Sequence, residues 1–211
     1  MNIKIVLISL ILILCTLNIV LIYQFYSLHK KYTDTTLRLE SEQKDNRDMS
    51  YIAFLKKQEF LSEDSKLSDY MVWDVKDNYD NLSQILTTEE RLVLYIDDKH
   101  CEACIQHCFD QLEKIFKEKI DQNVILLCNF RNSRHFIAFT QNLKIPIKYI
   151  YNLNGQTLNL PIEAVVDKPL FWIMNSELCS RQLFVPIKEI NGYTANYLTH
   201  ILNRYWNTNG E

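Results

Sequence analysis

Cys101 and Cys104 are separated by two residues and stand where an apolar run, 92–96, gives way to an amphipathic helical pattern. Two intervening residues place both sulfur atoms on the first turn of the predicted helix, within disulfide-bonding reach. The N-terminus of a helix also favours a thiolate over a thiol. The spacing and position of the pair therefore indicate thiol–disulfide chemistry.

Two alternatives account for the same residues. The pair could be a static disulfide, or two thiols that never react. Cys101, Cys104 and Cys108 also form a C-x2-C-x3-C series flanked by His100 and His107, and thiolate and imidazole ligands suit Zn or Cu(I). Because Cys108 falls on the apolar face of the predicted helix, one turn after Cys104, we expect it to be a buried core residue.

Composition excludes several classes of protein. The 211 residues are 47% hydrophobic, so the chain is not disordered by composition. A formal net charge of −3 without a basic block argues against nucleic-acid binding. Three glycines are too few for a glycine-rich phosphate loop. Of the six cysteines, Cys15 lies in the N-terminal apolar segment, and the odd remainder excludes a fully paired disulfide framework.

The chain begins with an apolar segment, Ile5 to Tyr23, that is long enough to cross a bilayer as a helix. No cleavage motif of small residues follows it, so an uncleaved anchor is favoured over a signal peptide. The short N-terminal tail is typical of a signal anchor that places the following domain outside the cytoplasm. We therefore predict an anchor at 1–28, a helical stalk at 29–68 and a folded domain at 69–211.

The remainder of the chain alternates apolar runs with amphipathic stretches. Ser133 and Thr194 are the predicted N-caps of its last two helices. Asp97 and Asp98 are interpreted as solvated loop charges, with a carboxylate pair that assists proton transfer as the alternative. The order strand, helix, strand, helix, strand, hairpin and helix predicts an α/β domain with a mixed sheet. Strands are predicted at 71–75, 92–96, 124–128, 147–151, 170–174 and 182–185, and helices at 101–119, 134–143 and 195–206.

This order of elements, with a Cys-x-x-Cys pair at a helix start and Pro169 before a β-hairpin, resembles the thioredoxin-like superfamily. The N-terminal anchor and the extra strand at 71–75 make it most similar to the membrane-tethered TlpA/ResA-type thiol–disulfide oxidoreductases of bacterial envelopes. The resemblance implies a thioredoxin-like mixed sheet flanked by helices, with Cys101 as the attacking thiol and Cys104 as the resolving thiol. It also implies that Pro169 faces the pair in cis, because tertiary context can fix a cis X–Pro bond.

Four residues depart from the pattern of the family and are candidate modulators of the reaction. His100 stands where the family often has a tryptophan, and Tyr95 where thioredoxins bury an acid. Glu102 replaces the first residue of the common glycine–proline pair, and Lys168 precedes Pro169 in place of a small or β-branched residue. We expect His100 to hold a positive charge beside the thiolate and Glu102 to oppose it.

Together these features predict an enzyme, a membrane-anchored thiol–disulfide oxidoreductase that acts on the extracytoplasmic (periplasmic) side. Its expected partners are protein dithiols and disulfides, the membrane and a membrane-bound or soluble electron donor, without nucleic acid or a cofactor. The alternative is a non-catalytic thioredoxin-fold module that binds Zn or Cu, through Cys101, Cys104 and Cys108, or a partner protein.

Overall fold

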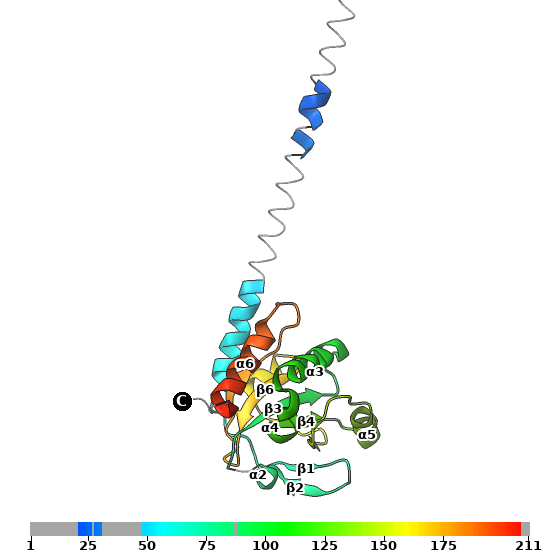
Figure 1. Cartoon of the computed structure of the whole chain (residues 1–211), viewed down its shortest axis with the longest axis vertical. Coiled ribbons are helices and arrows are strands. Elements are labelled where there is room, and N and C mark those ends of the chain that lie inside the picture. Colours follow the sequence, from blue (N-terminus) through cyan, green and yellow to red (C-terminus); the bar gives the residue numbers. More distant parts are fainter. Residues whose placement is uncertain (1–20, 27, 31–47, 87, 208–211) are drawn as a thin grey trace, which may run out of the picture. The chain divides into compact units, whose positions relative to one another are not determined.

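The computed structural model describes residues 21–26, 28–30, 48–86 and 88–207 (Figure 1). The chain divides into two compact units at residue 55. No helix within these described ranges is long and apolar enough to cross a membrane. Most of the predicted anchor at 1–28, and the first part of the predicted stalk at 29–68, fall outside the described residues.

The second unit is built on one mixed sheet, in which seven strands of the described chain follow the order β2-β1-β5-β4-β3-β6-β7. Strands β3, β4 and β5 run parallel, whereas β6, β7, β1 and β2 join by antiparallel pairing. The predicted mixed sheet is therefore confirmed. The strands are β1 (Met71–Trp73), β2 (Tyr79–Asn81), β3 (Arg91–Asp97), β4 (Val124–Asn129), β5 (Tyr149–Asn152), β6 (Leu170–Met174) and β7 (Arg181–Phe184).

Three long helices cover one face of this sheet (Figure 1). They are α3 (Glu102–Phe116), α5 (Ser133–Gln141) and α6 (Tyr193–Trp206), and α3 packs against α6. Four short helices also belong to the unit: α2 (Leu82–Ile85), η1 (Lys117–Lys119), α4 (Ile120–Asn123) and η2 (Pro161–Ala164). Residues 55–62 of the unit are helical as well.

Two predicted helix caps were each misplaced. Asn132, not Ser133, caps α5, because its side chain accepts hydrogen bonds from the backbone N–H groups of the first turn. Gly192, at a φ of 75°, occupies the N-cap position of α6, and glycine adopts this left-handed conformation without steric cost. Thr194 is instead buried, with its hydroxyl 3.1 Å from His107 Nε2.

The core lies between the sheet and these helices. Alternate residues of β3, namely Leu92, Leu94 and Ile96, point into it and are fully buried, as the two-residue period of a strand requires. Tyr95, between them, points to the opposite face of the sheet. The segment around Glu163 covers that second face, where the Tyr95 hydroxyl lies 3.0 Å from Glu163 Oε1.

Residues 55–68, which we predicted as part of the stalk, belong to the second compact unit. Leu55 is fully buried. Two carboxylates from this segment accept hydrogen bonds from backbone N–H groups in and just after the outer strand β7. Glu63 binds the N–H groups of Gln182 and Leu183 at 2.7 and 3.1 Å, and Glu59 binds that of Val185 at 2.9 Å. The predicted boundary at 69 therefore lies inside the unit.

Candidate functional site

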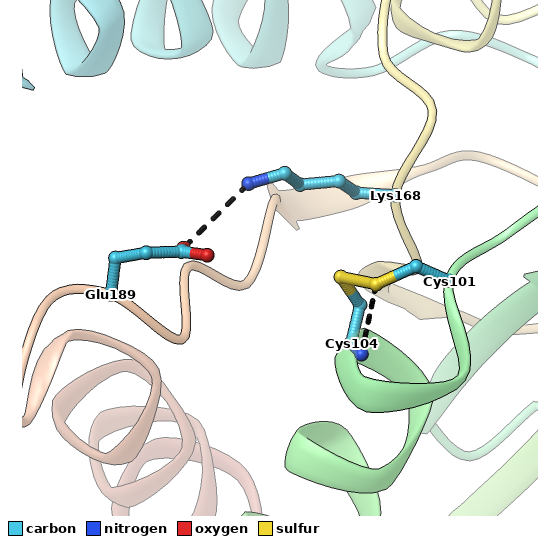
Figure 2. The surroundings of a disulfide bond; sticks show 4 residues. All are labelled: Cys101, Cys104, Lys168 and Glu189. Atoms are coloured by element: carbon cyan, nitrogen blue, oxygen red, sulfur yellow. Dashed lines mark hydrogen bonds and ion pairs between the residues drawn. A yellow bond between two sulfur atoms is a disulfide. The ribbon is translucent and has the colours of Figure 1, made fainter.

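Cys101 and Cys104 form a disulfide at the start of α3, with their Cα atoms 5.3 Å apart (Figure 2). Cys101 is the N-cap residue of the helix, in an extended conformation. Its Sγ occupies the place of a capping oxygen and accepts a hydrogen bond from the N–H of Cys104 at 3.2 Å. The pair therefore lies on the first helical turn, as the spacing predicted.

The two sulfur-bearing residues differ in their access to solvent. Cys101 is exposed, whereas Cys104, three residues further on in the same turn, is half-buried. When the disulfide is reduced, the N–H of Cys104 and the positive end of the α3 dipole both favour the thiolate of Cys101. An accessible thiolate backed by a sheltered second thiol is the arrangement that disulfide exchange requires.

His100 does not supply the positive charge that we expected beside this thiolate. Its ring is buried, and Nδ1 accepts a hydrogen bond from the N–H of Asp97 at 3.0 Å. Burial lowers the pKa of His100 to about 4, despite the nearby carboxylates of Asp97 and Asp167. The ring is therefore neutral at neutral pH. Glu102 is exposed in the first turn of α3, next to Cys101 in the chain. It remains a predicted modulator of the reaction.

Pro169 and Lys168 lie at the end of the sheet that carries the cysteines. The antiparallel register of β3 and β6 pairs Tyr95 with Leu170, which puts the residues before Leu170 level with the last residues of β3. The expected cis bond at Pro169 is wrong, because no peptide bond between described residues is cis. The trans form is the intrinsic preference of an X–Pro bond, and Pro169 is buried in it as the chain enters β6.

Lys168 forms an ion pair close to the disulfide. Figure 2 shows its side chain reaching toward Glu189, from the segment between β7 and α6, in the surroundings of the two cysteines. The distance from Lys168 Nζ to Glu189 Oε2 is 3.9 Å, and the lysine side chain is 21% exposed against 59% for the glutamate. A cation thus stands near the sulfur atoms, although it comes from Lys168 and not from His100.

Tyr95 lies in a buried polar cluster on the second face of the sheet. Its hydroxyl lies 3.2 Å from Asp97 Oδ2 and accepts a hydrogen bond from Asn129 Nδ2 at 3.2 Å. Burial and the charges of Glu163 and Asp97 raise the pKa of Tyr95, so the phenol keeps its proton. Tyr95 is therefore a hydrogen-bond donor at the position where thioredoxins have an acid.

Sequence reasoning missed two members of this cluster, Asn129 and Glu163. Asn129 was detectable in part, because it is a polar residue ending a buried parallel strand and lies in register with Asp97. Glu163 carried no signal. Asp97, expected as a solvated loop charge, is only 7% exposed. Burial opposes its ionisation, yet hydrogen bonds from the Lys99 N–H and the Asn129 amide hold the pKa of Asp97 below its ordinary value.

Cys108 lies apart from the disulfide in the hydrophobic core and is fully buried. Burial raises the pKa of its thiol, which therefore stays protonated. Within the described part of the chain, no three His, Cys, Asp or Glu side chains are arranged to hold a metal ion. The structure thus does not bring Cys101, Cys104 and Cys108 together as the ligand set of the metal-binding alternative.

The mixed sheet, its flanking helices and the disulfide at the start of α3 fit a thioredoxin-like α/β fold. Comparison with protein-family models finds no match, and comparison with curated proteins finds none either.

Solved structures give matches of low identity. An SCO1/SenC family lipoprotein from Bacillus anthracis has 11% identity and a TM-score of 0.48, covering 67% of this chain and 95% of its own. A provisionally described thiol–disulfide oxidoreductase from Bacteroides vulgatus has 15% identity and a TM-score of 0.47, covering 67% and 96%. Yeast Sco1 with copper bound has 12% identity and a TM-score of 0.46, covering 66% and 92%. Likenesses with TM-scores below 0.5 do not define the chemistry of the site, which follows from its own geometry.

Proposed function

We propose that this protein is a thiol–disulfide oxidoreductase that exchanges disulfides with other proteins through Cys101 and Cys104. The observation that carries the proposal is the disulfide between an exposed N-cap cysteine and a half-buried cysteine on the same helical turn. A disulfide with a purely structural role does not need an exposed sulfur atom at a helix N-terminus. An exchange catalyst needs one sulfur atom within reach of a substrate and a second one close behind it.

The reaction begins with the reduced pair. The thiolate of Cys101 attacks one sulfur atom of a substrate disulfide, forming a mixed disulfide and releasing the other substrate sulfur as a thiolate. The thiolate of Cys104 then attacks the Sγ of Cys101 and releases the second substrate thiolate. The Cys101–Cys104 disulfide forms as the substrate disulfide breaks, so two electrons pass to the substrate. The same steps in reverse oxidise a substrate dithiol.

Turnover in the reductive direction requires an electron donor, a partner dithiol that attacks the Cys101–Cys104 disulfide. Attack at Cys101 is the accessible route, because its side chain is exposed and that of Cys104 is half-buried. Pro169 lies at the same end of the sheet, where it is buried as the chain enters β6.

The setting that we propose is the outer side of a membrane, with the chain anchored by its N-terminal segment as in TlpA/ResA-type proteins. The apolar run from Ile5 to Tyr23 supports the anchor. An oxidising compartment is also where an exposed disulfide persists. Protease protection of the full-length protein in sealed membrane vesicles tests the orientation.

A redox titration tests the proposed activity. Equilibration of the full-length protein with mixtures of reduced and oxidised dithiothreitol, followed by alkylation, should give one two-electron transition assigned to Cys101 and Cys104. The protein should also accelerate the reduction of insulin by dithiothreitol. A protein that shows the transition but does not accelerate insulin reduction would be a binding module whose disulfide is reducible but not catalytic, contrary to the proposal.

The ion pair of Lys168 predicts opposite effects of two substitutions. Lys168→Met removes a cation near Cys101, so alkylation of the reduced protein by iodoacetamide near neutral pH should slow by about two- to fivefold, as expected for a partly exposed charge. Glu189→Gln removes the competing anion and should speed alkylation. Lys148→Met makes the same change just before β5, at the opposite end of the sheet, and should change nothing. Equal rates in all four proteins would exclude this role of Lys168.

A further inference from the structure

A cavity of about 390 Å³ opens between α3 and α5, beside the cysteine pair. The α3 residues that line it have no role in the disulfide-exchange steps described above. His100 and Glu102, the two neighbours of Cys101 in the chain, both line it. The cavity therefore lies next to the segment that carries Cys101, although neither cysteine is among its lining residues.

The floor of this cavity is apolar. Phe139 of α5 contacts two other rings, with centroid distances of 6.3 Å to Phe109 of α3 and 5.1 Å to Phe130. Phe130 and Phe139 are only partly buried, so aromatic surface remains open to the cavity. Further apolar side chains in the lining are Ile105, Leu143 and Ile145.

The rim of the cavity is acidic. Asp98, Glu102, Asp110 and Glu113 line it and are exposed, and the ionised Asp97 lies deeper. Three of the exposed carboxylates lie along α3 at positions 102, 110 and 113, whereas Lys144 is the single lysine or arginine among the lining residues of the described chain. Because His100 is neutral, it does not offset this charge. The cavity thus combines an apolar floor with an excess of negative charge.

We propose that this cavity binds a segment of the partner polypeptide in which an apolar side chain is flanked by lysine or arginine, next to the cysteine that reacts. The inference rests on the proposed function and specifies its substrate class. The apolar side chain displaces water from the floor of three phenylalanine rings. The cationic side chains match the carboxylates of the rim, which steers encounter and disfavours acidic partners.

The test compares two short peptides that differ only in charge. Each carries one leucine, one phenylalanine and one cysteine in a disulfide with thionitrobenzoate, and two lysines in the first peptide are replaced by two glutamates in the second. Attack by the reduced full-length protein releases thionitrobenzoate, which absorbs visible light. At low salt we expect the second-order rate constant of this single turnover to be at least about tenfold higher for the lysine peptide, and added salt should reduce the ratio.

A charge-reversal pair locates the effect. Asp110→Lys with Glu113→Lys reverses the rim away from the cysteines and should remove the preference for the lysine peptide. Glu118→Lys with Asp121→Lys changes the net charge equally at exposed positions beyond the end of α3 and should retain the preference. Both variants should react with iodoacetamide, which is uncharged and lacks a peptide, at similar rates. Equal use of the two peptides by the wild-type protein, or equal discrimination by both variants, would overturn the proposal.

A binding experiment separates this proposal from the proposed function. Fluorescein-labelled peptides with serine in place of cysteine cannot react, so fluorescence anisotropy with the oxidised full-length protein reports docking alone. Tighter binding of the lysine peptide supports the cavity even if no disulfide is exchanged. Exchange above the background of the Cys101→Ser variant without any charge preference in binding would retain the oxidoreductase and reject the docking site.

Discussion

Replacing Cys101 with serine is expected to abolish disulfide exchange, whereas replacing Cys104 should trap the protein as a mixed disulfide with its substrate. Cys101 carries the exposed sulfur atom at the helix N-terminus, and a serine hydroxyl cannot replace a thiolate as nucleophile. Cys104→Ser keeps that nucleophile but lacks the thiol that resolves the intermediate. The two variants should therefore fail at different steps.

Insulin reduction measures the loss of turnover, and intact-protein mass spectrometry after mixing with insulin measures the trapped adduct. Cys108→Ala is the matched control, because this third cysteine lies one helical turn further on but is fully buried in the core. It should keep exchange activity and form no lasting adduct. An adduct on Cys101→Ser, or wild-type rates in that variant, would show that the roles of the two cysteines are assigned incorrectly.

Acid should destabilise the folded protein through His100. The unfolded chain binds a proton on this residue near the ordinary pKa of 6.5, whereas the folded protein binds it only near 4. Protonation of Nδ1 in the fold would set two N–H groups against each other, because this atom accepts the N–H of Asp97. The difference between the two pKa values corresponds to on the order of 3 kcal/mol of folding free energy.

The sign follows from proton uptake on unfolding. The contribution of His100 is fully present above pH 6.5, falls as the pH drops toward 4, and stays constant below that value. Urea unfolding of the wild-type protein and of His100→Gln across this range measures it, and the variant should lose less stability on acidification. His135→Gln, at an exposed position on α5, should follow the wild type. Equal pH dependence in all three proteins would contradict the prediction.

The parts of the fold that the sequence predicted are those governed by local pattern. Apolar runs identify β3, β4 and β6 because the central strands of a sheet covered on both faces are apolar throughout. The helical period of α3 predicts which of its residues are buried, Cys108 and Leu112 among them. The disulfide is equally local, since its two cysteines share one turn.

The parts that could not be predicted depend on contacts between distant residues. The hydrogen bond of Tyr95 to Glu163 joins residues 68 positions apart, and no periodic pattern encodes such a pairing. The neutral state of His100 likewise depends on its burial and on the N–H of Asp97. The caps of α5 and α6 shifted by one or two positions because several residues near each helix start can take that role.

The two glutamates that hold β7 have a consequence for how other chains can approach this sheet. An unpaired outer strand normally offers its backbone to any extended peptide, which can add itself as a further strand and begin aggregation. Here Glu59 and Glu63 already occupy the amide protons of Gln182, Leu183 and Val185. A client protein therefore cannot lengthen the sheet through these groups, and its recognition falls to side chains around the sulfur atoms.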